Sequence, residues 1–197
     1  MGRIGTTLIA AMIAGTLLAS CGGDDGTAAT TTVSTVAPAY DVIRPATLAP
    51  GDEIPAPTGD VVLTLTGAIT NTNVGDTLVL DMDLLESLQL VEYTTPDDQA
   101  EGTDSTFRGV LLSDLVALSG ATDATNLHTV ALNDYAVDIP AADLEHAVMV
   151  ATSVNGERMT VERYGPTRIV YPYATDDLEP AIYDPRWIWQ LATIDIS

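Results

Sequence analysis

The sequence predicts an α+β fold, built mainly on an antiparallel β-sheet or sandwich with a few short helices. Several short segments alternate apolar and polar residues and end at turn residues, which is typical of half-buried strands. The helical patterns between them are short and do not alternate regularly with the strands, so we do not expect a parallel sheet of βαβ units. A hydrophobic content of 46% is sufficient for one core of ordinary domain size.

Residues 1–20 predict a lipoprotein signal peptide. Arg3 supplies a positive charge, and residues 4–18 form an apolar run shorter than the roughly 20 residues of a membrane span. The run ends in the lipobox sequence LASC, so Cys21 is the expected lipidation site and lipid anchor. The alternative is an ordinary secretory signal with a cysteine there by chance. We therefore expect an exported, membrane-anchored lipoprotein that faces the periplasm or the cell exterior.

Residues 21–58 are rich in Gly, Thr, Ala and Pro, and they predict a flexible tether. Residues 59–197 form the predicted domain. Because the only cysteine of the chain is Cys21, the domain has no thiol for a disulfide, a metal ligand or a nucleophile. Its two histidines are too few for a zinc site without carboxylate ligands.

Seven basic residues, all arginine, stand against 28 acidic residues, and the formal net charge is −21. A chain with this charge repels nucleic acid and anionic lipid, so we expect neither as a partner. The acidic residues are dispersed along the sequence, which is typical of a solvated surface.

The first strand of the domain is predicted over residues 61–69, where apolar and polar residues alternate. A second strand begins at Thr77 and turns into a short helix over 84–88. Asp81 or Asp83 is placed to cap this helix, because either side chain precedes it by one turn or less.

A third strand is predicted over residues 90–96, and Pro96 is expected to end it. After a polar loop, residues 106–121 predict a short strand and then a helix. Ser113 is the expected N-cap of this helix, and Gly120 is expected to close it.

Residues 127–140 predict two strands joined by a turn at Asn133-Asp134, and a helical turn follows over 141–148. Residues 148–163 predict a hairpin, since Asn-Gly at its centre is the strongest hairpin signal in the sequence. Two further strands are expected over 167–173 and 188–196.

Four phrases of the sequence occur in an order that resembles a known family. They are TFRGVLLSDLVALSGA, ALNDYAVDIPAADL, VATSVNGERMTVERYGPTRIVYPY and RWIWQLATIDI. In this order they resemble the oxidoreductase molybdopterin-binding domain, which has the sulfite-oxidase-type fold. The resemblance covers roughly residues 61–196 and is nearest to the small, stand-alone, exported branch of the family. It implies a cleft that binds a molybdopterin cofactor.

The resemblance implies a role for Arg168, which matches the family arginine on the strand after Gly-Pro. In the family, basic side chains bind the phosphate of the pterin cofactor. A guanidinium at the start of a strand offers a fork of donors to a phosphate or a carboxylate. An internal ion pair with one of the many acidic residues is an equally good interpretation of Arg168.

The sequence departs from the family at the metal ligand. Catalytic members hold molybdenum through a cysteine thiolate just before the Phe-x-Gly-Val motif, and here residues 91–110 contain no cysteine. Tyr93, Thr94 and Thr95 lie there instead, and a threonine hydroxyl is a poor substitute for a thiolate. We therefore expect no metal ligand and no catalytic residue, and a pterin or molybdopterin-like ligand without molybdenum.

Aromatic residues gather in the last third of the chain and predict stacking surfaces for a flat ring. If the segments are strands, Trp187 and Trp189 share one face, as do Tyr171 and Tyr173. The alternative is that the tryptophans close the core. Arg186 is expected to contact an aromatic ring or a ligand anion. The expected ligand-binding residues are Thr95, Asn133, Asp134, Tyr135, Arg168, Tyr171, Tyr173, Arg186 and Trp189.

Three functions are compatible with these observations. The first is a non-catalytic lipoprotein that binds a pterin or similar small heterocycle and signals to a membrane partner. The second is a molybdopterin-dependent oxidoreductase with atypical metal ligation. The third is an envelope interaction protein without a ligand. A hydrolase is not expected, because the sequence has no Gly-x-Ser-x-Gly motif.

Overall fold

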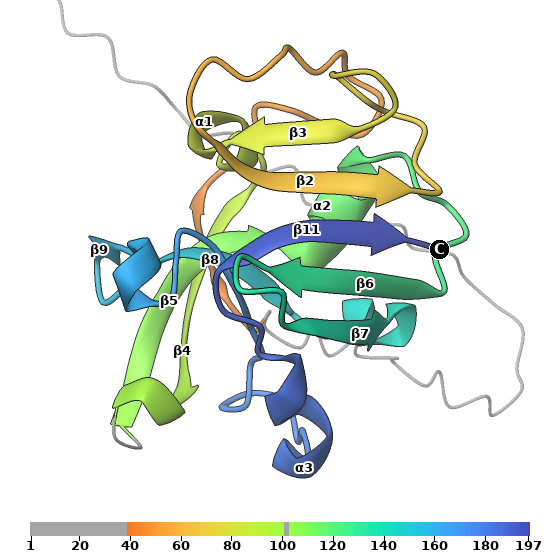
Figure 1. Cartoon of the computed structure of the whole chain (residues 1–197). Coiled ribbons are helices and arrows are strands. Elements are labelled where there is room, and N and C mark those ends of the chain that lie inside the picture. The colour runs from red at the N-terminus through yellow and green to blue at the C-terminus, as the bar shows by residue number, and fades with distance from the viewer. Residues whose placement is uncertain (1–38, 101–102) are drawn as a thin grey trace, which may run out of the picture. The chain divides into compact units, whose positions relative to one another are not determined.

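The alternating segments form two β-sheets (Figure 1). In the first sheet the strand order is β1-β4-β5-β8-β10, and the short β9 pairs with β8. All pairs in this sheet are antiparallel. The strands are β1 (Asp41–Arg44), β4 (Leu90–Asp97), β5 (Thr103–Leu111), β8 (Met149–Val154), β9 (Glu157–Arg158) and β10 (Arg168–Val170).

The second sheet has the strand order β3-β2-β11-β6-β7. Its strands are β2 (Val61–Gly67), β3 (Leu78–Asp81), β6 (Asn126–Ala131), β7 (Ala136–Pro140) and β11 (Leu191–Ile196). The pair β2–β11 is parallel, and the other pairs are antiparallel. The expected architecture, mainly antiparallel sheets with a few short helices, is therefore confirmed.

The helices are short. They are the α-helices α1 (Met82–Leu85), α2 (Leu112–Leu118) and α3 (Pro180–Tyr183), and the 3₁₀ turns η1 (Asp98–Ala100), η2 (Ala141–Glu145), η3 (Val161–Arg163) and η4 (Asp184–Arg186). α2 buries Leu112, Leu115, Val116 and Leu118, so most of its length faces the core. Figure 1 shows α2 behind β2 and β11.

This computed structural model describes residues 39–100 and 103–197, all within the compact unit Ala37–Ser197. The expected signal peptide and the expected lipidation site at Cys21 lie outside the described residues. Among the residues that are described, no helix is long and apolar enough to cross a membrane.

Apolar residues from both sheets form the main core. β2 shows how the sequence builds it, because its alternation buries Leu63 and Leu65 and turns the residues between them outward. A smaller cluster lies under the first sheet and includes Tyr93, Phe107 and Met149, with Trp187 packed against it. This smaller cluster supports the candidate site described below.

The folded part of the chain begins earlier than the expected boundary at residue 59. β1 pairs with β4, and Ile54 is 5% exposed within the core. The backbone N–H groups of Thr58 and Gly59 both donate to Oδ2 of Asp81 at 2.8 Å. The sequence pattern missed this part because β1 buries none of its residues and is held by backbone hydrogen bonds.

One expectation about helix ends is corrected, and two are confirmed. Ser113 lies inside α2, and Leu111 takes the N-cap position without a side-chain hydrogen bond. The helix is held instead by burial of its apolar residues. Asp81 caps α1, accepting from the Leu84 N–H at 2.9 Å. Gly120 follows α2 in the left-handed conformation, with φ of 72°, as expected of a helix-closing glycine.

Pro96 lies inside β4 and does not end it, which corrects another expectation. β1 pairs only with the first residues of β4, from Leu90 to Glu92. Beyond Glu92 the strand is therefore a sheet edge on that side, where a proline is tolerated. The expected hairpin is confirmed, because Asn155 and Gly156 join β8 to β9 with φ values of 51° and 82°.

Asp81 yields a prediction about acid stability. The N–H of Leu84, with those of Gly59 and Thr58, holds the pKa of this carboxyl below its ordinary value of 3.8. Asp81→Asn is expected to lower the free energy of unfolding by about 2 kcal/mol at pH 7, because an amide presents only one acceptor oxygen. A lowered folded-state pKa stabilises the protein above the unfolded pKa, and the effect is lost as pH falls through the folded value.

The difference between the wild type and Asp81→Asn should therefore shrink as pH falls below 3.8. Urea unfolding at a series of pH values measures it. Asp76→Asn, at an exposed turn residue, is the control and should change stability by less than about 0.5 kcal/mol. A difference that stays constant down to the lowest pH would contradict this role of Asp81.

Candidate functional site

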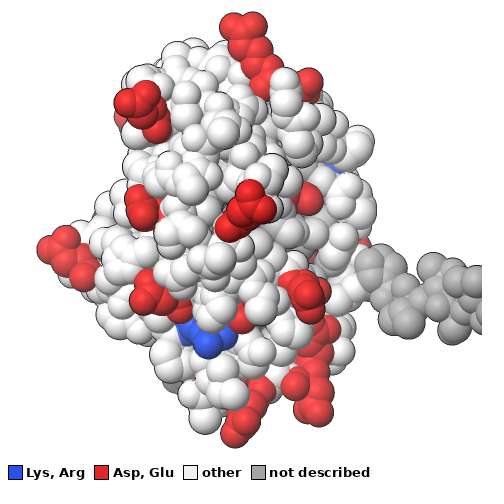
Figure 2. Space-filling view, turned by 90° about the vertical axis from the view of Figure 1, so that its right-hand side faces the viewer, with Lys and Arg blue, Asp and Glu red and all other residues white. Residues whose placement is uncertain are grey.

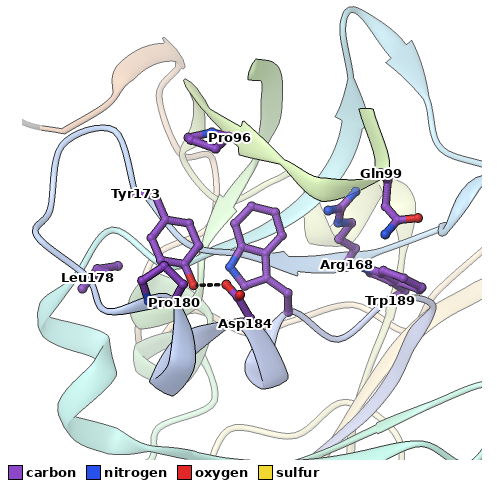
Figure 3. A pocket seen from close by; sticks show the side chains of 9 residues that line it. Pro96, Gln99, Arg168, Tyr173, Leu178, Pro180, Asp184 and Trp189 are labelled. Atoms are coloured by element: carbon purple, nitrogen blue, oxygen red, sulfur yellow. Dashed lines mark hydrogen bonds between the residues drawn. The ribbon is translucent and has the colours of Figure 1, made fainter. Parts of the chain in front are cut away.

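A cleft opens between the end of β4 and the connection from β10 to β11 (Figure 3). Its first pocket has a volume of about 340 Å³. Figure 3 shows Pro96 and Gln99 on one side, with Tyr173 and Asp184 on the other. The residues that line this first pocket are Pro96, Gln99, Arg168, Tyr173, Leu178, Pro180, Asp184, Trp187 and Trp189.

A second pocket of about 340 Å³ adjoins the first. It lies between the turn that joins β6 to β7 and the segment after α3. Its lining residues are Asn133, Tyr135, Asp184, Pro185, Trp187, Trp189 and Gln190. Asp184, Trp187 and Trp189 line both pockets, so these three side chains form the partition between them.

The chain after β10 is fixed to β4 by buried hydroxyl groups. Tyr93 Oη donates to the Val170 carbonyl at 2.8 Å, and Thr95 Oγ1 donates to the Tyr171 carbonyl at 3.0 Å. Thr95 Oγ1 also accepts from the Tyr173 N–H at 3.0 Å. Thr95 is fully buried and lines neither pocket, which corrects its expected place among the ligand-binding residues. Its role is to position Tyr173.

Asp143 joins two other residues that were expected in the site. Oδ2 of this buried carboxylate accepts from Tyr171 Oη at 2.8 Å and from Arg186 Nη1 at 2.7 Å. Burial, together with the nearby charge of Asp143, raises the pKa of the Tyr171 phenol far above its ordinary value. The Arg186 guanidinium lies 5.1 Å from the centre of the Tyr183 ring. Tyr171 and Arg186 line neither pocket. Arg186 holds η4 against η2, and Tyr171 fixes the segment after β10 to η2.

Arg168 forms an internal ion pair and also lines the first pocket. Its Nη2 lies 2.9 Å from Oδ1 of Asp97, and the two side chains are only 3% and 5% exposed. The guanidinium carbon lies 4.8 Å from the Phe107 ring centre and 5.1 Å from that of Trp187. Within the described residues, its Nε is buried without a hydrogen-bond partner. The ion-pair interpretation of Arg168 is therefore confirmed.

Trp187 is the ring of the partition that neighbouring aromatic side chains hold in place. It stacks on Tyr173, with ring centres 5.6 Å apart and planes at 16°, and meets Phe107 edge-on at 6.2 Å. Its Nε1 is buried and has no hydrogen-bond partner among the described residues. Tyr173 Oη donates to Oδ1 of Asp184 at 2.6 Å, as Figure 3 shows. Trp187 is therefore fixed while its edge borders both pockets.

Trp189 is more open than Trp187. It is 38% exposed and leans on Tyr164, with ring centres 4.7 Å apart. Both tryptophans precede β11, which begins at Leu191, so the expected strand arrangement of the two rings is wrong. The same applies to the tyrosines, because β10 ends before Tyr171, which is buried while Tyr173 lines the cleft.

The residues in the cleft do not fit a molybdenum-loaded molybdopterin. The segment expected to hold the ligating cysteine contributes Pro96 and Gln99 to the first pocket, and neither supplies a thiolate. Among the described residues, no group of three His, Cys, Asp or Glu side chains could hold a metal ion. Among the described residues that line the pocket, Arg168 is the only cation, and it is already paired with Asp97, while Asp184 adds a second negative charge.

The overall charge of the protein is also unfavourable for a phosphate. Figure 2 shows acidic side chains spread over one face of the molecule, on which basic side chains are scarce. The formal net charge of −21 has the same sign as a phosphate. What the cleft offers instead is ring surface and a few polar groups, which suit an uncharged flat molecule.

The structure brings part of the expected site together. Arg168 and Tyr173 line the first pocket, Asn133 and Tyr135 line the second, and Trp189 lines both. Asp134 lies exposed on its turn, with φ of 64°, and lines neither pocket.

Sequence reasoning missed several lining residues. They are Pro96, Gln99, Leu178, Pro180, Asp184, Pro185, Trp187 and Gln190. The sequence offered one signal for these residues. Glu179-Pro180 and Asp184-Pro185 interrupt regular structure and indicate an irregular connection before the last strand. An aromatic-rich connection with two prolines is a better candidate for a pocket wall than a strand.

Comparisons with known proteins agree with this fold. A sequence model of the oxidoreductase molybdopterin-binding domain matches residues 71–178. Among solved structures, the sulfane dehydrogenase SoxCD from Paracoccus pantotrophus is similar, with a TM-score of 0.52 and 18% identity. The match covers 68% of this chain but only 37% of that chain, and at this identity it shows the fold alone. No curated protein matches the chain.

Proposed function

Because this chain belongs to the oxidoreductase molybdopterin-binding domain family, we propose that its cleft binds a flat, uncharged heterocycle, a pterin or a close relative, without molybdenum and without redox catalysis. The observation that carries the proposal is the composition of the cleft. Aromatic rings and prolines form its walls, whereas the soft ligand and the free cations that a metal-loaded phosphorylated cofactor needs are missing from its lining.

The shape and chemistry of the two pockets support a small ring system. Each pocket has about 340 Å³, within the range of small-molecule sites. Trp189 offers exposed ring surface to both pockets, and Gln99 and Asn133 supply amide groups at opposite ends of the cleft. A pterin needs this combination, because its faces stack while its edge forms hydrogen bonds.

The expected result of the first experiment is a bound small heterocycle. The full-length protein, purified without denaturation, should release such a molecule on extraction, and mass spectrometry identifies it. After the ligand is removed, titration with unsubstituted pterin should change tryptophan fluorescence in a saturable way, because Trp187 and Trp189 border both pockets. Metal analysis of the same preparation should give molybdenum far below one atom per chain.

Stoichiometric molybdenum would overturn the proposal and favour an oxidoreductase with atypical ligation. A flat fluorescence response, with no molecule recovered on extraction, would favour an envelope interaction protein that keeps the fold without a ligand. The three functions are thus separated by one preparation and three measurements.

The proposal includes an exported, lipid-anchored location and a membrane partner that senses whether the cleft is occupied. Its support is the LASC sequence ending at Cys21, which a lipoprotein requires. Incorporation of labelled palmitate by the wild type, and its loss in Cys21→Ser, is the expected result in a bacterial host. Equal labelling of the two chains would contradict the anchor.

A further inference from the structure

We propose that Asp97 determines the class of ligand by occupying, from within the protein, the position that an anionic group would take at Arg168. This inference rests on the proposed function, since it names the charge of the ligand that the same cleft accepts. Asp97 is thereby a specificity-determining residue that excludes phosphorylated and carboxylated molecules and leaves the cleft to uncharged rings.

The ion pair is built into the protein interior. Arg168 Nη2 and Asp97 Oδ1 are 2.9 Å apart, and neither side chain is more than 5% exposed. Arg168 begins β10 and Asp97 ends β4, two strands that are not neighbours in the first sheet. Phe107 and Trp187 hold the guanidinium at their rings, so it cannot swing toward solvent without losing both contacts. The pair therefore keeps one arrangement.

An incoming anion would have to compete with Asp97. Displacing the carboxylate from the guanidinium leaves it buried with only the Gln99 N–H, 3.2 Å from Oδ1, as a donor among the described residues, which is strongly unfavourable. Binding beside it would place two negative charges at one cation, with Asp184 as a third negative charge in the pocket. Of the lining residues that the structure describes, Arg168 is the only cation. A phosphate, which carries about −1.5 to −2 charges at pH 7, is therefore rejected.

The donors that Asp97 does not use define what the cleft accepts. Arg168 Nε and Trp187 Nε1 are both buried, and neither has a hydrogen-bond partner among the described residues. Both side chains line the first pocket. A ring carbonyl or an unprotonated ring nitrogen is an acceptor without a full charge, so it can pair with a donor of this lining without disturbing the ion pair.

The first test removes the internal anion and supplies one from solution. Asp97→Ala and Asp97→Asn in the full-length protein are expected to gain a site for formate and for inorganic phosphate. Thermal unfolding midpoints of both variants should rise saturably with either anion at constant ionic strength. The apparent affinity should be at least about tenfold higher than in the wild type, a shift within reach of one buried charge pair.

Glu92→Gln is the matched control. Glu92 lies on the same strand and pairs with Arg108 at 2.8 Å, but this ion pair is much more open to solvent, with side chains 28% and 39% exposed, and it lines neither pocket. Its removal should change the anion response by less than about twofold, because solvent screens an exposed pair. A double variant, Asp97→Ala with Arg168→Met, should lose the anion response, which locates the new site at Arg168.

If an Asp97 variant does not fold in chloride buffer, refolding yield in formate is measured instead. Recovery of folded protein in formate supports the inference, and equal yields in formate and chloride overturn it. A wild type that binds phosphate as tightly as Asp97→Asn also overturns it.

The second test compares neutral and phosphorylated ligands by calorimetry. The wild type should bind unsubstituted pterin at least about tenfold more tightly than a pterin that carries one phosphate, and Asp97→Asn should narrow or reverse this preference. Equal binding of both ligands by the wild type contradicts the role of Asp97. If no pterin binds any variant while the anion response is present, the proposed function fails and the assignment of Asp97 stands.

Discussion

Trp187→Leu is expected to weaken the binding of unsubstituted pterin by about 30-fold or more, which corresponds to about 2 kcal/mol. Trp187 lines both pockets, so its loss removes part of the wall that the two pockets share. The substitution also removes the ring on which Tyr173 stacks and one of the two rings that contact the Arg168 guanidinium. Isothermal titration calorimetry measures the effect without relying on the fluorescence of the remaining tryptophan.

Tyr164→Leu is the matched control for this prediction. Tyr164 is also an aromatic residue near the cleft, 38% exposed and in contact with Trp189, but it lines neither pocket. The change should alter pterin affinity by less than about threefold, the size of a contact that acts through a neighbour. Wild-type affinity in Trp187→Leu, with the protein folded, would show that the ligand binds elsewhere.

Phe107→Ala is expected to lower the free energy of unfolding by about 3–5 kcal/mol. Phe107 is fully buried in β5, meets Trp187 edge-on and lies under the Arg168 guanidinium. Truncation leaves a cavity beneath both residues and removes a cation–π contact from a buried charge. Urea unfolding followed by circular dichroism measures the loss, which should appear as a lower midpoint with an unchanged slope.

Phe107→Leu and Val161→Ala are the controls for this second prediction. The leucine variant keeps most of the volume and should lose only about 1–1.5 kcal/mol. Val161 is 46% exposed, so its truncation should change stability by less than about 0.5 kcal/mol. A loss below about 1 kcal/mol in Phe107→Ala would mean that the cluster under the first sheet does not support the cleft.

The elements that sequence reasoning predicted well are those whose signal is local. The hairpin at Asn155-Gly156 needs two residues in the left-handed conformation, and this dipeptide adopts it at low cost. β2 follows from alternation alone, because one of its faces is buried. β1 has no such signal, since its residues are all exposed and its place depends on hydrogen bonds to β4.

The candidate site was predicted only in part, because its walls come from segments without periodicity. Two of the expected residues, Tyr171 and Arg186, were chosen for their chemistry, but the fold uses that chemistry to bind Asp143. The sequence leaves open whether Trp187 offers a stacking surface or closes the core, and the structure places it in the lining of both pockets. An aromatic residue has the same appearance in a sequence whether its ring closes a core or borders a pocket.

The sequence alone determined the class of fold, the family resemblance, the acidic character and the lack of a cysteine between residues 91 and 110. These properties follow from residue type and order along the chain. Only the tertiary structure decided that Arg168 is neutralised by Asp97. The two residues lie 71 positions apart in the sequence, and they meet where β4 ends and β10 begins. Charge pairing across a core depends on which strands come together, and no local sequence pattern encodes which distant residues will meet.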